Sequence, residues 1–346
     1  MMIHLFFSLF ILVSALSIKH RAFFYLALLM LFLFAALRYG YGNDYFSYSR
    51  CFLEIHAMGS NPFPGEWLFT VLNRILPHYF WLIACTSLAF IYAIGRFLQK
   101  NVPDQYLWFS FFLLLINPYL FLMHLSAIRQ CMALVCFLFA VSFAHKRRPL
   151  SYVLLCASAC GFHNSAVVLF PIYFWANERQ VTRRTILALA AGTAVLLCSG
   201  HWLEQLVSKS LTVLQLTRYQ HVITTGTHNS LRATLLSAVP LIYLLWLLPR
   251  LQGRTLVYAK LWFAGCLLSV LAFRLSMLTR PEMYFDFFSI AAFPRLLKEQ
   301  HGDHALSQFF LRWLFPAVIL MILVLRYYSF FTNPMWKRFF AYRTIL

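Results

Sequence analysis

The sequence predicts an all-α, polytopic membrane protein built as a bundle of helices. Of its 346 residues, 62% are hydrophobic and 11% are charged, and its mean hydropathy is +0.71. A water-soluble fold of this size exposes too much surface to be covered by so few polar side chains. The apolar residues form long unbroken runs, which favour membrane helices over the alternating pattern of an outer-membrane barrel.

The charges are strongly unbalanced: 29 Lys and Arg residues stand against 10 Asp and Glu residues, which gives a formal net charge of +19. In a soluble protein this excess would indicate nucleic-acid binding, which we do not expect here. In a membrane protein, one group of cations occupies short cytoplasmic loops and sets the topology. Arginines on the opposite side have two explanations: they extend toward lipid head groups, or they bind an anionic, phosphate-bearing ligand.

The cysteines and acids indicate neither a disulfide framework nor a metal site. All of the eight cysteines except Cys51 lie in apolar runs, where we expect them to be small packing residues. The acids on the predicted outer side are too scattered to form a ligand set. We therefore predict no metal.

The first half of the chain is predicted to cross the membrane five times. The expected spans are residues 3–18, 22–37, 79–98, 106–124 and a fifth that ends at Lys146. Cationic groups follow the first, third and fifth spans, and the positive-inside rule places these groups in the cytoplasm. The N-terminus and Arg38 are therefore expected outside.

Two segments of this half differ from ordinary spans. Residues 38–78 are polar and aromatic, and we expect them to lie along the outer interface with an amphipathic helix at 67–76. Residues 150–176 hold two apolar stretches of roughly a dozen residues, each shorter than the ~20 that cross a bilayer comfortably. Because basic residues flank both ends, we expect two short helices that meet at His163 in a cavity open to the outside.

The second half is predicted to continue with spans at residues 185–199, 231–248, 255–278, 283–297 and 308–325. A second outer loop is expected at about 200–230. This gives 11 to 12 membrane segments, including short or re-entrant ones, in a single membrane domain that comprises residues 1–346. The basic, aromatic C-terminal tail belongs inside by its charge and outside by the number of crossings.

The polar segment after the second span has features of a binding pocket. It begins at Arg38, contains two glycines that permit a tight turn, and continues through Asp44, Tyr45 and Tyr48. We expect Arg38 and Asp44 to point into one pocket, and tyrosine rings are well suited to stack on sugar rings. The alternative is an interfacial aromatic belt with one structural ion pair.

Two further arginines are expected to meet an anion on the outer side. Arg129 begins a long helix, and a guanidinium there opposes the helix dipole unless a bound anion attracts both. Arg280 ends another span, close to Glu282 and Tyr284. His163, at the break between two short helices, is a candidate base, and its alternative role is that of a hydrogen-bonded core residue.

Five motifs in a fixed order carry a resemblance to a known family. They are R-Y-G-x-G-x-D-Y-x-x-Y from Arg38 to Tyr48, Glu66 before an amphipathic stretch, I-R-Q-x-x-A from Ile128 to Ala133, F-H-N-S-A from Phe162 to Ala166, and R-x-x-x-Y from Arg280 to Tyr284. With these motifs the chain resembles the EpsG family, membrane polymerases of the Wzy type that act on bacterial surface polysaccharides (O-antigen, capsular polysaccharide or exopolysaccharide). The resemblance extends from about residue 20 to about 300, and the tail beyond does not contribute to it.

The resemblance implies a GT-C-like polytopic glycosyltransferase in the bacterial inner membrane. Its substrates would be oligosaccharide repeat units on undecaprenyl pyrophosphate, at the periplasmic or outer face. The growing glycan would pass from its lipid diphosphate to the non-reducing end of a new lipid-linked unit. Because the lipid diphosphate is an activated donor, neither a nucleotide nor another cofactor is expected. The partners implied besides the bilayer are a chain-length regulator and an oligosaccharide flippase.

The resemblance also assigns roles to the candidate residues. Arg129 and Arg280, then Arg38, would bind the diphosphate, because cations must stabilise the charge that develops on this leaving group. Asp44 is the first candidate for the catalytic base and His163 the second. The candidates for binding or orienting sugars are Tyr45, Tyr48, Glu66, Gln130 and Tyr284, and pairing with an arginine is the alternative role of Glu66.

Two other functions stay open at the level of the sequence. A flippase or transporter of the same lipid-linked oligosaccharide would also need cationic cavities. It should, however, carry charges near mid-membrane in two similar halves, whereas the polar residues here concentrate at the outer ends of spans. A membrane O-acyltransferase of surface glycans would also use a histidine and arginines, but its donor would approach from the cytoplasm.

Overall fold

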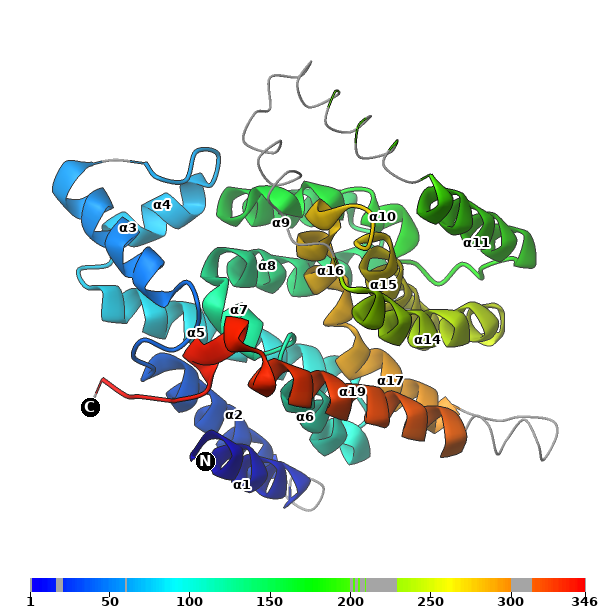
Figure 1. Cartoon of the computed structure of the whole chain (residues 1–346), viewed down its shortest axis with the longest axis horizontal. Helices are drawn as coiled ribbons and strands as arrows, with labels where there is room; N and C mark the ends of the chain where they lie inside the picture. The colour runs from blue at the N-terminus through cyan, green and yellow to red at the C-terminus, as the bar shows by residue number, and fades with distance from the viewer. Residues whose placement is uncertain are drawn as a thin grey trace. The chain divides into compact units, whose positions relative to one another are not determined.

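A computed structural model of the chain describes residues 2–16, 21–59, 61–199, 202, 205, 209, 229–299 and 313–345. Throughout these residues the regular elements are helices, apart from one isolated β-bridge between Arg38 and Thr344 (Figure 1). The helices form two compact units: unit 1 comprises Met1–Phe174 with Phe293–Leu346, and unit 2 comprises Trp175–Ala292. The single membrane domain predicted for residues 1–346 stays a prediction.

Five helical segments are long and apolar enough to cross a membrane. They are α5 (Tyr79–Asn101), α8 (Ile128–His145), α14 with the short helix that follows it (Leu231–Arg250), α15 (Gly253–Leu271) and α19 (Phe315–Thr332). Shorter apolar segments accompany them in the described residues: Phe6–Leu16, Arg21–Ala36, Asp104–Ile116, Pro149–Phe162 and Asn164–Trp175. The prediction of an all-α, polytopic membrane protein is therefore confirmed, whereas the total of 11 to 12 segments stays a prediction.

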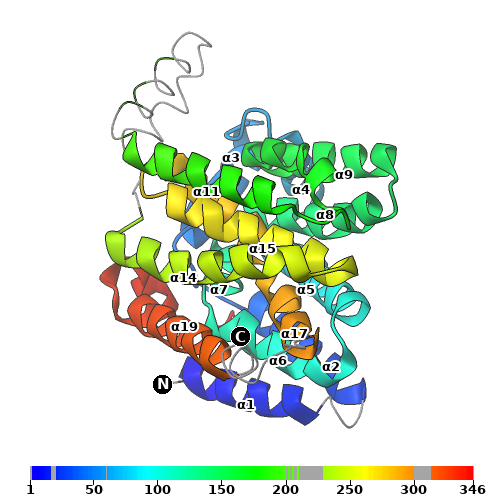
Figure 2. The ribbon, with the colours of Figure 1, turned by 90° about the vertical axis from the view of Figure 1, so that its right-hand side faces the viewer.

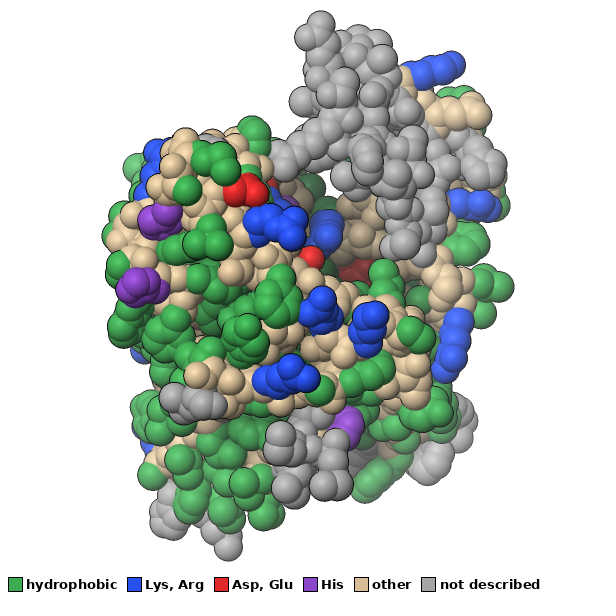
Figure 3. Space-filling view, turned by 60° about the vertical axis from the view of Figure 1, so that its left-hand side comes forward, with side chains coloured by type: hydrophobic (Ala, Val, Ile, Leu, Met, Phe, Trp, Pro, Cys, Tyr) green, Lys and Arg blue, Asp and Glu red, His purple; other side chains and the backbone are tan. Residues whose placement is uncertain are grey.

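The outer surfaces of these helices carry apolar side chains, as contact with lipid requires. On α5, for example, Trp81, Leu88 and Tyr92 are exposed, and these positions share one face of the helix because they are separated by seven and four residues, about two turns and one turn. Figure 3 shows hydrophobic side chains over much of one face of the molecule, with Lys and Arg side chains between them. Such broad apolar exposure is typical of a surface that is in contact with membrane lipid.

Unit 1 contains the predicted outer segment (residues 38–78) and most of the predicted short-helix pair (residues 150–176). Besides α5, α8 and α19, its helices are α1 (Met2–Leu16), α2 (Arg21–Ala36), α3 (Tyr45–Met58), α4 (Trp67–Ile75), α6 (Leu107–Ile116), α7 (Leu122–Ser126) and α9 (Pro149–Phe162). Helices α8 and α9 lie side by side (Figures 1 and 2). The predicted amphipathic helix at 67–76 is present as α4, and α9 ends directly before His163, as predicted.

The alternating direction of these helices gives unit 1 two distinct ends. Arg21 at the start of α2 pairs with Asp104, which follows α5, at 3.7 Å. Arg38, which follows α2, donates to Ser87 Oγ in the first half of α5 at 3.0 Å, so α2 and α5 are antiparallel. We call the end that holds Arg38 the site end, and the end that holds Arg21 the basic end.

Two predictions for unit 1 differ from the structure in extent. The span expected at 106–124 divides, because α6 ends at Ile116 and the short α7 follows. Asn117 has extended backbone (φ −101°, ψ 96°), which is the conformation that a following proline, here Pro118, favours. The second arm of the short-helix pair also divides, into a 3-10 helix (Asn164–Leu169) and α10 (Ile172–Trp175).

Unit 2 contains α11 (Arg183–Cys198), α14 (Leu231–Leu247), α15 and α16 (Thr279–Asp286). The span predicted at 255–278 ends at Leu271, and the span predicted at 283–297 is wrong, because α16 and α17 (Ser289–Glu299) take its place. The break between α16 and α17 packs closely against α15 at Gly265. A Cβ at this position would stand 2.6 Å from Asp286 N, so the close contact requires a residue without a side chain. Most of the predicted outer loop at 200–230, and the predicted start of the last span at 308, lie outside the described residues.

A buried lysine links a loop of unit 2 to α15. Lys260 Nζ donates to the carbonyl oxygens of Asn177 (3.0 Å) and Arg179 (2.6 Å). Its charge also lies 5.3 Å from the ring centroid of Trp175. The ammonium group therefore satisfies backbone acceptors that would otherwise be costly to bury.

The C-terminal tail lies at the site end of unit 1. Tyr39 N donates to Arg343 O (2.8 Å) and Ile345 N to Leu37 O (3.1 Å), and Tyr342 Oη donates to Phe34 O (2.7 Å). The tail is thus joined to the end of α2. The tail therefore lies at the same end of unit 1 as Arg38, in keeping with the number of crossings, and the side of the membrane that it faces stays a prediction.

Candidate functional site

The segment that follows α2 is shaped by two glycines and docked by one serine. Gly40 and Gly42 have positive φ (61° and 103°), and a Cβ at Gly42 would lie 3.2 Å from Ser126 Cα. Ser126 Oγ accepts from Asp44 N (3.1 Å) and donates to Asp44 Oδ2 (3.2 Å). Asp44 is therefore fixed against the end of α7, where it begins α3.

A buried carboxylate, Glu66, gathers donors from two distant parts of the chain. Its side chain is 3% exposed. Glu66 Oε2 accepts from Arg129 Nη1 at the start of α8. Glu66 Oε1 accepts from His163 Nδ1 (2.8 Å) and from Asn164 N (3.2 Å). A guanidinium, a carboxylate and an imidazole thus form one continuous network at the site end, and we call these three residues the Glu66 network.

Close backbone packing holds Glu66 against His163. Gly65 has φ +83°, and a Cβ there would stand 2.9 Å from Asn164 Oδ1, so both the conformation and the space favour glycine. Asn164 Nδ2 in turn donates to Pro64 O (3.3 Å). A Cβ at Gly161 would lie 2.9 Å from Leu68 on α4. The turn before α4 and the turn after α9 therefore fit together.

Arg129 is oriented by aromatic residues as well as by Glu66. Its Nε donates to Tyr48 Oη on α3 at 3.3 Å. The guanidinium carbon lies 4.3 Å from the ring centroid of Phe63, a distance typical of a cation–π contact. The side chain remains 21% exposed, and Nη2 is not used by Tyr48 or Glu66. A fixed, partly open guanidinium at a helix N-terminus is suited to bind an anion.

The charge state of Glu66 follows from these contacts. Burial alone would raise the pKa of Glu66, but the hydrogen bond from His163 and the positive charge of Arg129 outweigh it, so its pKa lies below its ordinary value of 4.5. An ionised Glu66 accepts the proton on His163 Nδ1, which leaves the lone pair of the neutral imidazole on Nε2. His163, which is 18% exposed, is thus oriented as a base whose reactive nitrogen is Nε2.

This lowered pKa predicts a pH dependence of stability. A carboxyl group with a lower pKa in the folded chain contributes stability that is fully present above its unfolded value, near 4.5, and that is lost as the pH falls through its folded value. Melting temperatures of the purified protein in detergent should therefore fall as the pH is lowered below about 4.5. The fall should be smaller for Glu66→Gln, and an equal fall in both proteins would contradict the assignment.

The structure brings together some of the predicted site residues and separates others. Glu66, Arg129 and His163 form the Glu66 network, and Tyr48 contacts it by accepting a hydrogen bond from Arg129. Asp44 lies one helical turn before Tyr48, whose N donates to Asp44 O (2.9 Å). Tyr45 is buried on α3, three residues before Tyr48, and Gln130 is buried next to Arg129 on α8.

Arg38 does not have the predicted environment. It is 2% exposed and donates to the carbonyl oxygens of Ala35 and Leu125 as well as to Ser87. Its guanidinium therefore faces protein acceptors that fix α2 against α5 and α7, and the expectation of a pocket shared with Asp44 is wrong. A guanidinium committed in this way is not available to a diphosphate in this structure.

Arg280 and Tyr284 belong to α16 in unit 2. Tyr284 is fully buried, as expected of a packing residue more than of a sugar platform. The assignment of Arg280 to the diphosphate stays a prediction.

Several contributors to the site were not predicted from the sequence. Phe63 beneath the guanidinium, Gly65 and Asn164 all help to build it. The Pro64–Gly65 pair marks a turn directly before Glu66, and Asn164 directly follows the candidate histidine, so both signals were visible. Within the described residues, no three His, Cys, Asp or Glu side chains stand close enough to hold a metal ion.

Comparison with known protein families gives a match over nearly the whole chain. A family model described as the EpsG family matches residues 21–344. No curated protein and no solved structure matches the chain. The matched range includes all the candidate site residues and also the tail beyond residue 300, where the sequence motifs carried no resemblance.

Proposed function

Because the chain belongs to the EpsG family, whose model matches nearly its whole length, we propose that it is a Wzy-type polysaccharide polymerase. It transfers the growing glycan from undecaprenyl pyrophosphate to the non-reducing end of a new lipid-linked repeat unit. The observation that carries this proposal is the Glu66 network, which joins a partly open guanidinium to an oriented imidazole through one buried carboxylate. A base and an anion-binding group are the two parts that this reaction requires.

In the proposed reaction the acceptor hydroxyl oxygen forms a bond to the anomeric carbon of the donor sugar. The bond from that carbon to the diphosphate oxygen breaks, and the lipid diphosphate leaves with the bonding electron pair. His163 Nε2 takes the hydroxyl proton. Arg129 stabilises the negative charge that develops on the leaving oxygen. Glu66 holds the imidazole in its tautomer and balances the positive charge that forms, as the acid of a catalytic triad does.

The contacts favour His163 over Asp44 as the base, which reverses the order expected from the sequence. His163 is held by a carboxylate with a lowered pKa. Asp44 instead exchanges two hydrogen bonds with Ser126 at the start of α3, an arrangement that favours a positioning role for this carboxylate.

The charge distribution supports a site that faces the periplasm. The basic end of unit 1 holds Arg96, Lys100 and the run Lys146–Arg148, and the positive-inside rule assigns such clusters to the cytoplasm. The Glu66 network stands at the opposite ends of α5 and α8. Lipid-linked repeat units that have been moved across the inner membrane would reach it there.

The size distribution of the glycan tests the proposed function. A strain that lacks this protein should make single repeat units attached to lipid or core and no long chains, and the wild-type gene should restore the ladder. Electrophoresis of surface glycan, with separate analysis of lipid-linked material on each side of the inner membrane, provides the measurement. Repeat units trapped on the cytoplasmic side would instead identify a flippase and overturn the proposal.

A further inference from the structure

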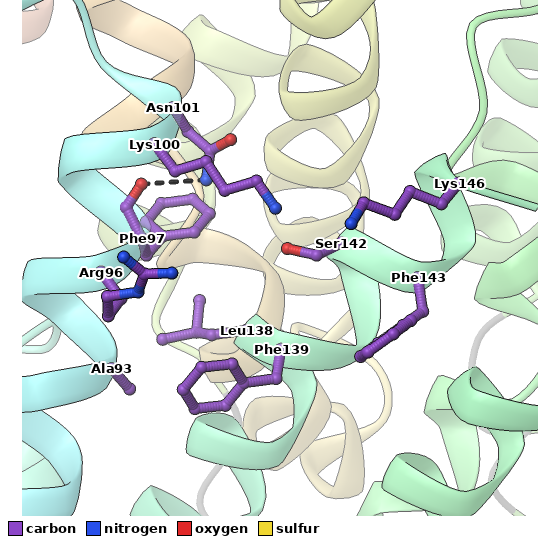
Figure 4. A pocket seen from close by; sticks show the side chains of 10 residues that line it. All are labelled: Ala93, Arg96, Phe97, Lys100, Asn101, Leu138, Phe139, Ser142, Phe143 and Lys146. Atoms are coloured by element: carbon purple, nitrogen blue, oxygen red, sulfur yellow. Dashed lines mark hydrogen bonds between the residues drawn. The ribbon is translucent and has the colours of Figure 1, made fainter. Parts of the chain in front are cut away.

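The C-terminal tail (residues 333–345, which include a 3-10 helix at Pro334–Phe339) lies against the linker between α2 and α3, residues 37–44 (Figure 1). The basic end, where Figure 4 shows a hollow between α5 and α8, is at the other end of unit 1. The linker ends at Asp44, which is fixed to the end of α7. Contacts between the tail and the linker therefore act on a segment of the candidate site.

The tail supplies hydrogen-bond donors to the end of α2. The last carbonyl groups of a helix have no partner within the helix. Here Tyr342 Oη donates to Phe34 O (2.7 Å), and Ile345 N donates to Leu37 O (3.1 Å), just after the last turn. The tail thus closes the end of α2 in the way that a capping motif usually does.

Aromatic rings and one amide extend these contacts along the linker. Tyr41 is fully buried, and its ring lies 5.2 Å from that of Phe339 and 5.3 Å from that of Tyr342, both at steep angles. Such edge-to-face pairs are favourable at this distance. Asn43 Nδ2 donates to Met335 O (3.1 Å). The tail therefore contacts the linker from the end of α2 to the residue before Asp44.

The composition of the linker makes these contacts important. Gly40 and Gly42 both have positive φ, and a glycine loses more conformational freedom on folding than any other residue. A linker with two glycines in eight residues has a single conformation only where contacts outside it offset this entropy. The tail provides such contacts on the α2 side, and Ser126 provides them on the α3 side.

The far end of the linker leads to the guanidinium of the site. Asp44 exchanges two hydrogen bonds with Ser126, which stands three residues before Arg129. On the other side, Asp44 precedes Tyr48 by one turn of α3, and Tyr48 Oη accepts from Arg129 Nε (3.3 Å). The direction of the guanidinium therefore depends on where the linker places the start of α3.

We propose that the C-terminal tail is a positioning element of the candidate site. By fixing the linker it keeps Asp44 on Ser126 and Tyr48 on Arg129, so that the guanidinium stays aligned for the diphosphate. Tyr342 is its central positioning residue, because its hydroxyl caps α2 and its ring packs on the ring of Tyr41. The proposal rests on the proposed function for the role of Arg129.

The reactivity of a native cysteine tests the proposal without an activity assay. Cys51 on α3 is partly buried against the aromatic cluster of that helix, whereas Cys85 on α5 is exposed. In the purified full-length protein, Tyr342→Ala should make alkylation of Cys51 on the order of tenfold faster and leave that of Cys85 unchanged, as measured by peptide mass spectrometry. The matched control Tyr328→Ala removes an exposed tyrosine of α19 and should change neither rate.

Chain extension by reconstituted protein provides the second measurement. At matched amounts of folded protein, Tyr342→Ala should lower the rate by up to about a hundredfold, the loss that follows when a group at the reacting centre is displaced by about 1 Å. Tyr342→Phe keeps the ring and should retain more activity. Where Tyr342→Ala does not fold, Asn43→Ala, which removes the donor to Met335 O, should cause the same two changes to a smaller extent.

The proposal requires both changes, at Cys51 and in the rate. An unchanged alkylation rate of Cys51 would overturn it. Faster alkylation with an unchanged rate per folded molecule would show that the tail only stabilises the fold, and an equal acceleration at Cys85 would show a general loosening; either result overturns the proposal. If the wild type itself extends no chains, the proposed function fails, and faster alkylation of Cys51 would then show only that the tail fixes α3.

Discussion

Replacing Arg129 with alanine is expected to abolish chain growth, so that cells display single repeat units in place of a ladder of long chains. The guanidinium is fixed by Tyr48, Glu66 and Phe63 at the start of α8, where the helix dipole also favours an anion. Removal of one preorganised donor to a developing negative charge costs about 10²- to 10³-fold in rate. Electrophoresis of the surface glycan, or chain extension by reconstituted protein, measures this loss.

The variant also leaves Glu66 buried with fewer charge partners, which lowers stability. Protein level in the membrane must therefore be measured alongside activity. Arg129→Lys keeps the charge without the planar fork and should retain part of the activity. Arg50→Ala removes an exposed arginine from neighbouring α3 and should leave the ladder unchanged. Long chains made by Arg129→Ala at normal protein level would remove this residue from the proposed reaction.

Replacing His163 with alanine should slow polymerisation by about 10²- to 10⁴-fold, the range that general base catalysis contributes. Glu66→Gln should cause a smaller loss, because it keeps the shape of the side chain while removing the charge that balances the imidazolium. A purely structural histidine would instead lower the amount of folded protein, so rates are compared at matched amounts of folded protein. An unchanged rate per folded molecule in His163→Ala would exclude this residue as the base.

The companion variant Asp44→Asn distinguishes the two candidate bases. It weakens the contact with Ser126 and should reduce activity less than His163→Ala does. Chain extension should be assayed with reconstituted protein and a defined lipid-linked repeat unit, at matched amounts of folded protein. If Asp44→Asn abolishes extension while His163→Ala retains it, the base is Asp44 and the assignment made here is wrong.

The helices that depend on local sequence were predicted well. Helix α4 has the predicted bounds within one residue, and α9 ends at the predicted break before His163, because the hydrophobic period and the flanking polar residues are local signals. The breaks near Asn117 and within 283–297 were missed. Hydropathy averaged over a window does not register a proline effect or a close helix contact such as that of Gly265 with Asp286.

For the candidate site residues, the sequence predicted the identities but not the contacts between them. Glu66, Arg129 and His163 were all selected from the sequence, but their association was not, because Glu66 and His163 are 97 positions apart. Arg38 appeared equivalent to Arg129 as a cation at the end of a span. Packing separated them: one guanidinium is buried against backbone carbonyls, and the other remains partly open.

The sequence by itself determined that the chain is a helical membrane protein, which ends of its helices are basic, and to which family its motifs are similar. These properties are sums over neighbouring residues, and composition and order are enough to fix them. Only the tertiary structure decided that Glu66, and not Asp44, joins His163 to Arg129. Which partner a buried charge finds depends on where remote helices meet, and that contact is set by packing over the whole unit.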